Sequence, residues 1–392
     1  MFRIDSVSPL TLARGSETTR IPPRAEEHRQ AGYVEQFDEL TVFYDTFTRD
    51  GELVMVVPPL LNLTVDRVQG AAGTSTTFDL HKTVRVTSAA GDGPDTVVTV
   101  SGQSLENVTG EADWTSFAGR RVLVTMTKDN DRQWIREWIS YYASTHGTDT
   151  VFLYNNGSTD DSEAVLEAAC ADPGILTAVV VRWPFKYGPQ GGPASKWDSD
   201  YSQVGALEQA RQEYLGAAAS VLHVDIDELV VSEVSIHQLA ERHGAVSCNG
   251  VWISAARVAI DGSSFEQFPF REPAAPPCAT KWCVVPSRVP ESAWLGVHNV
   301  FGVEVVHHAN ATYRHFRAIT TNWKYNRTTT SDRPSDDHID HELRRALVAS
   351  AAATEARLAA SRPAASSTAS APSSPSRAVR RLAGAVYRRI RG

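Results

Sequence analysis

The hydrophobic and polar positions change their pattern partway along the chain. Between Tyr33 and Gly110, short apolar and β-branched segments such as LVMVVPPLL and TVVTVSG alternate with turn signals such as DG and AAG. This pattern predicts strands rather than helices, and hence a small all-β accessory domain over residues 31–115. Residues 1–30 are polar and show neither period, so we expect a disordered leader there.

From residue 118 onward, apolar segments alternate with stretches of helical periodicity. Strands are predicted at residues 120–127, 149–155, 175–185 and 220–232, and helices at 128–146, 158–169 and 202–216. This order predicts an α/β domain over residues 118–350 with a doubly wound, mostly parallel sheet. Ligands of such sheets bind beyond the carboxyl ends of the strands, where this sequence places its polar residues. A closing helix is expected over residues 336–360.

The segment 220–232, SVLHVDIDELVVS, carries two aspartates at the end of a run that predicts a buried strand. Because burying an unpaired carboxylate is costly, Asp225 and Asp227 must face solvent, pair with a cation or bind a metal. Carboxylate oxygens beside the phosphates of a substrate suit Mn²⁺ or Mg²⁺. We therefore expect a metal–diphosphate site at this strand end; the alternative is a surface turn.

Composition places the chain among ordinary globular proteins. Of its 392 residues, 42% are hydrophobic and 21% are charged, and no run of eighteen apolar residues predicts a membrane span. The first twenty residues lack the apolar segment of a secretory signal. The 4 cysteines form no CxxC pair and fit reduced thiols better than disulfides or a zinc site. We expect a cytoplasmic protein.

Charge is distributed unevenly. The chain has a net charge of −8, and residues 361–392 carry seven arginines and no acid, so removing that tail leaves −15 on residues 1–360. An acidic body argues against nucleic acid as a partner, which requires a basic surface.

The tail has two parts. Residues 361–376 are a low-complexity linker, and residues 377–392 place apolar side chains at intervals of three and four among arginines. Such a basic amphipathic segment predicts peripheral attachment to an anionic membrane surface, at the inner face of the cell membrane. The alternative is a disordered basic terminus.

The order of the motifs TKDND, REWISYY, FLYNNGSTDDS and HVDIDELV, with Gln203 on the helix before the last, resembles the nucleotide-sugar domain of GT-A-fold glycosyltransferases. It is most similar to the glycosyltransferase family 2-like and family 92-like group, over about residues 120–327. The resemblance implies a Rossmann-like GT-A domain that transfers a hexose, with inversion, from a nucleotide-sugar donor. It favours a UDP-sugar donor and a glycan or lipid-linked acceptor of a cell-envelope polysaccharide.

The same resemblance implies roles for individual residues. Asp227, Asp225 and His315 are expected to bind Mn²⁺ or Mg²⁺, with Glu228 either orienting a ligand or capping a helix. Residues expected to bind the donor are Thr127, Asp129, Asn156, Asp160, Lys186, Gln203, Asp225 and Lys324. The structural alternative is a helix cap for the loop 155–161 and a solvated charge for Lys186.

An inverting transfer also needs a carboxylate within hydrogen-bond reach of the acceptor hydroxyl. Asp261 and Glu266, in AIDGSSFEQF, are the candidates for this catalytic base, and either could equally be a surface-loop residue. His298 is a candidate on the acceptor side.

Two other functions fit parts of the pattern. A strand that ends in Asp-x-Asp also opens haloacid-dehalogenase-like phosphatases, although Leu229 and the upstream NNGSTDD loop argue against that class. A non-catalytic glycan-binding or scaffold domain is the other alternative; it predicts carbohydrate binding that requires neither metal nor nucleotide.

Overall fold

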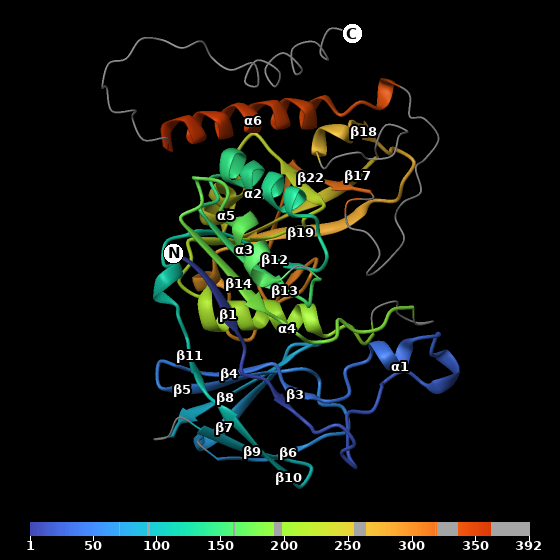
Figure 1. The fold of residues 1–392 in the computed structure, drawn as a ribbon, viewed down its shortest axis with the longest axis vertical. Coiled ribbons are helices and arrows are strands. Elements are labelled where there is room, and N and C mark those ends of the chain that lie inside the picture. Colours follow the sequence, from blue (N-terminus) through green and yellow to red (C-terminus); the bar gives the residue numbers. More distant parts are fainter. Residues whose placement is uncertain are drawn as a thin grey trace, which may run out of the picture. The chain divides into compact units, whose positions relative to one another are not determined.

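The apolar segments of the α/β region assemble into one large mixed sheet in the structure, which is a computed structural model (Figure 1). The structure describes residues 1–361 except 70, 92–94, 160, 192–197, 255–263, 318 and 320–335. Within them the large sheet has ten strands in the order β1-β14-β13-β12-β15-β19-β17-β22-β16, with β18 beside β17. Their bounds are β1 Phe2–Ser6, β14 Thr177–Arg182, β13 Thr150–Asn155, β12 Arg121–Thr127, β15 Ser220–His223, β19 Cys278–Val284, β17 Ala245–Ser254, β22 Val306–Phe316, β16 Glu228–Val231 and β18 Phe270–Arg271.

Half of this sheet is parallel and covered on both faces. Strands β1, β14, β13, β12 and β15 all run parallel. Alternate side chains of these strands enter two separate cores: Leu123 and Leu153 pack with helices α2 (Arg132–His146), α3 (Ser162–Ala169) and α5 (Ile236–His243). Their neighbours Val124 and Tyr154 pack with α4 (Ser202–Gln209) and the π-helix η3 (Ala210–Tyr214). Burial on both faces explains why these strands read as unbroken apolar runs.

The chain changes direction across the sheet between β12 and β15. From β12 it moves outward through β13 to β14, and it then returns to place β15 on the other side of β12. In an open α/β sheet this reversal creates a crevice beyond the carboxyl ends of the two central strands. The end of β12 at Thr127 and the loop that follows β15 therefore border the same crevice.

The expectation of a single strand over 220–232 is wrong. Strand β15 ends at His223, and β16 begins at Glu228 on the far edge of the sheet, where it pairs antiparallel with β22. Between them the amide of Glu228 donates to the carbonyl of Asp225 at 3.0 Å, which closes a turn. The two carboxylates thus lie in a loop that joins the parallel half of the sheet to its mixed half.

The predicted accessory region consists mainly of β-strands. Its strands are β3 Thr41–Phe43, β4 Asp45–Arg49, β5 Glu52–Val57, β6 Val65–Gln69, β7 Ala71–Asp79, β8 Val84–Ala90, β9 Asp95–Val100, β10 Gln103–Val108 and β11 Gly110–Glu111. They form a five-stranded and a three-stranded sheet, and β3 pairs with β2 (Leu10–Thr11). Phe47 and Val54 share a core with Leu207 of α4, and residues Met1–Leu358 form one compact unit.

Short elements complete the described chain. They are η1 Glu26–His28, α1 Tyr33–Gln36, η2 Thr115–Phe117, η4 Phe265–Gln267, η5 Pro286–Arg288, β20 Trp294–Leu295, β21 Val300–Phe301 and η6 Asp336–His338. The closing helix is α6, His341–Ser361, close to its predicted span.

The expectation of a disordered leader is wrong. Strand β1 adds to the edge of the large sheet, with Ile4 opposite Val180 of β14 and packed against the core. Further along, the buried guanidinium of Arg20 donates to the carbonyls of Asp38 and Pro59. These partners are distant in sequence, so local composition did not reveal them.

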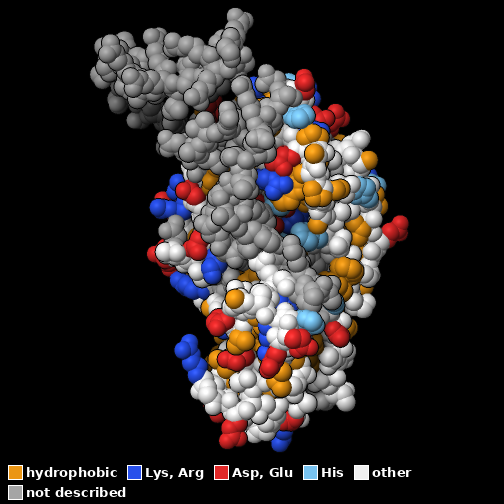
Figure 2. All heavy atoms as spheres, turned by 90° about the vertical axis from the view of Figure 1, so that its right-hand side faces the viewer, with side chains coloured by type: hydrophobic (Ala, Val, Ile, Leu, Met, Phe, Trp, Pro, Cys, Tyr) orange, Lys and Arg blue, Asp and Glu red, His pale blue; other side chains and the backbone are white. Residues whose placement is uncertain are grey.

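In the described part of the chain, every helix is too short or too polar to cross a bilayer. The predicted basic tail and nearly all of its linker lie outside the described residues, so membrane attachment stays a prediction. On the face drawn in Figure 2, the described acidic and basic side chains are interspersed and form no broad area of one charge.

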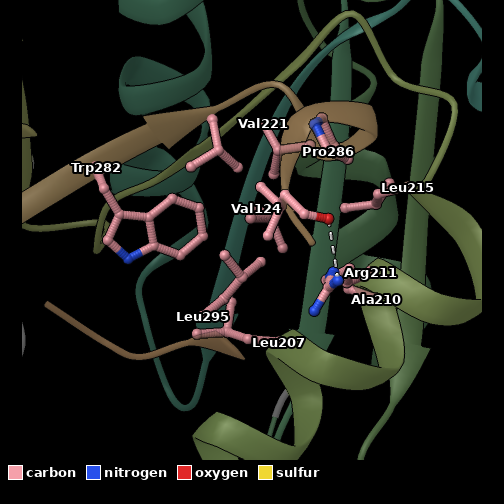
Figure 3. A pocket seen from close by; sticks show the side chains of 11 residues that line it. Val124, Leu207, Ala210, Arg211, Leu215, Val221, Trp282, Pro286 and Leu295 are labelled. Atoms are coloured by element: carbon pink, nitrogen blue, oxygen red, sulfur yellow. Dashed lines mark hydrogen bonds between the residues drawn. The ribbon is translucent and has the colours of Figure 1, made fainter. Parts of the chain in front are cut away.

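A small cavity lies between the large sheet and α4 (Figure 3). Its walls are mostly aliphatic, with Trp282 and Arg211 at its margin, and its volume is about 10 Å³. This is space for one water molecule at most. The cavity is a packing gap in the core and no nucleotide fits it.

Candidate metal centre

The loop after β15 brings its acids against strand β22. The carbonyl of Asp227 accepts from the amide of Phe316 at 2.8 Å, and Glu228 pairs directly with His315 in the ladder between β16 and β22. Residues that are almost ninety positions apart in the sequence are thereby held in register by backbone hydrogen bonds. The structure therefore brings together Asp227 and His315, two residues expected to share a metal site.

Three side chains converge in this place. His315 Nε2 is 3.4 Å from Asp227 Oδ2, and His315 Nδ1 is 3.6 Å from Glu228 Oε1. One ligand atom from each of the three residues lies within 4.8 Å of the others. The side chains of Asp227 and Glu228 are buried, and 12% of the His315 side chain is exposed.

The acids determine the charge of the imidazole. Burial opposes a charged His315, but the nearby carboxylates of Asp227 and Glu228 outweigh it and raise its pKa to about 9. Burial also raises the pKa of Glu228, and the ammonium of Lys281 opposes that shift. Without a metal ion, an imidazolium is thus the counterion of these two acids at neutral pH.

Lys281 of β19 completes the cluster from the other side. Its side chain is fully buried, and its Nζ lies 2.8 Å from Asp225 Oδ2 and 3.0 Å from Glu228 Oε2. The amide of Asp225 also donates to Glu228 Oε2 at 2.8 Å. Burial disfavours the ammonium, but the two carboxylates raise the pKa of Lys281 above its usual value. This lysine is therefore a permanent positive charge.

Neighbouring elements hold the cluster rigidly. The hydroxyl of Tyr142 on α2 donates to the carbonyl of Glu228 and accepts from the amide of Val230. The indole of Trp252 stacks on the imidazole of His315 with ring centres 4.1 Å apart. These contacts fix both the strand that carries Glu228 and the plane of the imidazole, so the cluster is preorganised.

The residues fit a divalent metal ion. Ligands that are adjacent in an octahedron of the size Mn²⁺ or Mg²⁺ prefers lie about 3 Å apart, close to the separation of Asp227 Oδ2 and His315 Nε2. Glu228 Oε1 is buried and has no hydrogen-bond partner among the described residues, although it faces the other imidazole nitrogen. A carboxylate in that position commonly orients a metal-bound histidine.

The predicted donor-binding residues at the ends of β12 and β13 are engaged in local structure. Thr127 Oγ1 donates to Asn130 Oδ1, and the carboxylate of Asp129 accepts from the amide of Thr159 at 2.6 Å. Asn156 Nδ2 donates to the carbonyls of Trp183 and Phe185. These contacts shape the loop edge of the crevice, and the predicted nucleotide contacts stay predictions.

The remaining candidates lie in several places. Lys186 Nζ donates to the carbonyl of Phe37 at 3.0 Å, which connects it to the N-terminal segment, and Gln203 Oε1 accepts from the hydroxyl of Tyr187. Glu266 is exposed in η4. Asp160, Asp261 and Lys324 lie outside the described residues.

Sequence reasoning missed Lys281 and Trp252. Both lie in strands whose apolar pattern favours core positions, and their partners come from the register of β19, β17 and β22. A basic residue within an apolar strand segment was the only signal for Lys281. A comparison of the sequence with known proteins finds no matching family model and no matching curated protein.

Proposed function

We propose that this protein is a metal-dependent glycosyltransferase of the GT-A type, which transfers a hexose from a nucleotide-sugar donor. The observation that carries the proposal is the convergence of Asp227 and His315, 3.4 Å apart, where the loop that follows β15 meets the end of β22. UDP is the favoured nucleotide, and a glycan or lipid-linked molecule is the proposed acceptor. Such an enzyme requires a donor site, a metal site and a catalytic base.

The metal site would consist of Asp227 and the Nε2 atom of His315. A bound Mn²⁺ or Mg²⁺ supplies positive charge that stabilises the diphosphate leaving group. Glu228 Oε1 lies 3.6 Å from His315 Nδ1, so its negative charge favours a proton on Nδ1 and leaves Nε2 for the metal. Trp252, stacked on the ring, prevents the imidazole from turning away.

The donor would lie across the crevice between β12 and β15. Thr127 and Asp129 stand at the end of β12, and Asp225 follows β15, so one nucleotide can reach both strand ends. The carboxylate of Asp225, whose side chain is 28% exposed, can accept hydrogen bonds from ribose hydroxyls.

The catalytic base is proposed to be Glu266 or Asp261. Glu266 lies in η4 next to Phe265, which packs on Phe316 of β22, one residue from His315. Its carboxylate is exposed, so an acceptor can reach it from solvent. It would accept the proton of the acceptor hydroxyl as that oxygen attacks the sugar.

Nucleotide binding tests this proposal. Thermal unfolding is measured with UDP, GDP, CDP and ADP, with and without Mn²⁺, for the native protein and Asp227→Asn. We expect one nucleotide to stabilise the protein only when Mn²⁺ is present, by about 2.7 kcal/mol at 100 times its Kd, and we expect Asp227→Asn to lose this effect. If no nucleotide stabilises the protein at millimolar concentration, the donor site is wrong.

The same purified protein distinguishes the two alternative functions, a phosphatase and a glycan-binding scaffold. A phosphatase of the haloacid-dehalogenase type would hydrolyse a generic phosphomonoester with Mg²⁺ and would not require a nucleotide diphosphate. A glycan-binding scaffold would bind oligosaccharides equally well after metal chelation. Either outcome, together with absence of nucleotide binding, would replace the proposed function.

A further inference from the structure

The buried ammonium of Lys281 has no role in the transfer described above, yet it lies inside the acidic cluster. It contacts Asp225 Oδ2 at 2.8 Å and Glu228 Oε2 at 3.0 Å, with no exposure to solvent. Stability alone does not explain such a group. A buried ion pair is often replaced by apolar residues without loss of stability, because the desolvation of the charges offsets their attraction.

We propose that Lys281 sets the affinity of the metal centre. Its fixed charge cancels one of the three carboxylates, so that a divalent ion binds weakly by itself and is held firmly only together with a diphosphate. The inference rests on the proposed function, because it assigns the lysine a part in the same metal site. Lys281 is a positioning and charge-balancing residue, since it reaches the metal side only through Glu228 and Asp225.

Charge counting supports this role. Asp225, Asp227, Glu228 and Lys281 together carry −2, with the imidazole neutral once it binds a metal. Without the ammonium the same site would carry −3 and would attract any divalent cation more strongly. At the separations in this cluster, one unit of charge changes the affinity for a divalent ion by about tenfold or more.

The orientation of the Glu228 carboxylate also supports this role of Lys281. The ammonium holds the Oε2 atom of Glu228, which leaves Oε1 facing His315 Nδ1. If the lysine were absent, Glu228 could rotate toward the metal and become a direct ligand. The site would then change from an open centre that a diphosphate completes to a closed centre that binds metal alone.

The test is a set of four variants whose Mn²⁺ affinity is measured by isothermal titration at pH 8. Lys281→Met removes the charge at similar length, Lys281→Arg keeps it, and Glu228→Gln removes the matching acid. The fourth variant combines Lys281→Met with Glu228→Gln and restores the native charge of −2. Arg121→Met is the matched control, because Arg121 pairs with Glu241 at 2.7 Å beside the opposite end of β12.

We expect Lys281→Met to bind Mn²⁺ at least about tenfold more tightly than the native protein and to gain less affinity when UDP is added. The double variant, Lys281→Arg and Arg121→Met should bind like the native protein, and Glu228→Gln should bind more weakly. A purely structural lysine would lower the thermal midpoint in Lys281→Met and leave the Mn²⁺ affinity unchanged, which would overturn the inference.

Two comparisons keep the result decisive. If Lys281→Met fails to fold, the double variant must still bind Mn²⁺ more tightly than Glu228→Gln, and equal affinities would refute the role of the lysine. If the native protein binds no Mn²⁺ even with saturating UDP, the metal site of the proposed function fails as well. If the protein binds the metal but the variants do not follow the expected order of affinities, only the role of Lys281 is refuted.

Discussion

His146 shows how a single buried residue makes folding depend on pH. Its Nε2 atom donates to the carbonyl of Val230 at 2.8 Å, and its Nδ1 atom accepts from the amide of Ile236. Burial lowers its pKa to about 4, although the bond to Val230 opposes the shift. A protonated ring would place an N–H against the amide of Ile236, so the neutral form is the one that folds.

Because the pKa of His146 is lowered in the folded state, the stability of the protein decreases as the pH falls. The unfolded chain binds the proton with a pKa near 6.5, so stability is complete above that pH and falls as the pH drops toward 4. We expect a loss of about 3 kcal/mol across this window, and His146→Gln should remove this share of the slope. Urea unfolding at several pH values measures it, with the exposed His28→Gln as control. An unchanged slope in His146→Gln would contradict this account.

Residue types alone identified part of the candidate metal centre. Asp225 and Asp227 were recognisable because paired acids after an apolar strand need an explanation, and His315 was included through the family resemblance. Lys281 was not recognisable, since its partners depend on which strands become neighbours in the sheet. Their chemical roles as ligands remain predictions.

At the scale of elements, periodicity predicted the strands and helices of the parallel half well. It failed where the cause was a contact between distant segments. Segment 220–232 separates into β15 and β16 because the turn at Asp225–Glu228 sends the chain across the sheet, although apolar residues flank the turn on both sides. Strand β1 has five residues, too few for a period to be recognised.

Strand β1 gives a prediction about the edge of the sheet. Ile4 packs against the core, whereas Phe2 on the same strand is 51% exposed. We expect Ile4→Ala to lower the free energy of unfolding by about 1–2 kcal/mol and Phe2→Ala to change it by less than about 0.5 kcal/mol. Denaturant unfolding measures both. Equal effects of the two substitutions would mean that the first residues do not form this strand.

At the scale of the whole molecule, the β-rich region and the α/β region share buried charge as well as a core. The guanidinium of Arg85 on β8 lies 2.6 Å from the carboxylate of Glu208 on α4, and both side chains are almost fully buried. Gln209 Nε2 on α4 also donates to Asp45 Oδ2 on β4. The accessory region predicted from the sequence is therefore attached to the helix that covers one face of the large sheet.

We expect the two regions to unfold together. Arg85→Met leaves Glu208 buried with less compensation and should cost about 3 kcal/mol, whereas Arg67→Met at an exposed position should cost less than about 0.5 kcal/mol. Tryptophan fluorescence reports mainly on the α/β region, which carries eight of the nine tryptophans, and far-ultraviolet circular dichroism reports on both. Coincident single transitions are the expected result, and two separate transitions would show that the regions are independent.

Asp227 and His315 are proposed to hold a divalent metal ion where the loop after β15 meets the end of β22. Anomalous diffraction from crystals soaked in Mn²⁺ and UDP tests this proposal most directly, because it locates the ion without relying on activity. We expect a peak bonded to Asp227 Oδ2 and His315 Nε2 at about 2.2 Å from each. A fully occupied peak elsewhere, or none at this site while His315 stays paired with Asp227, would contradict it.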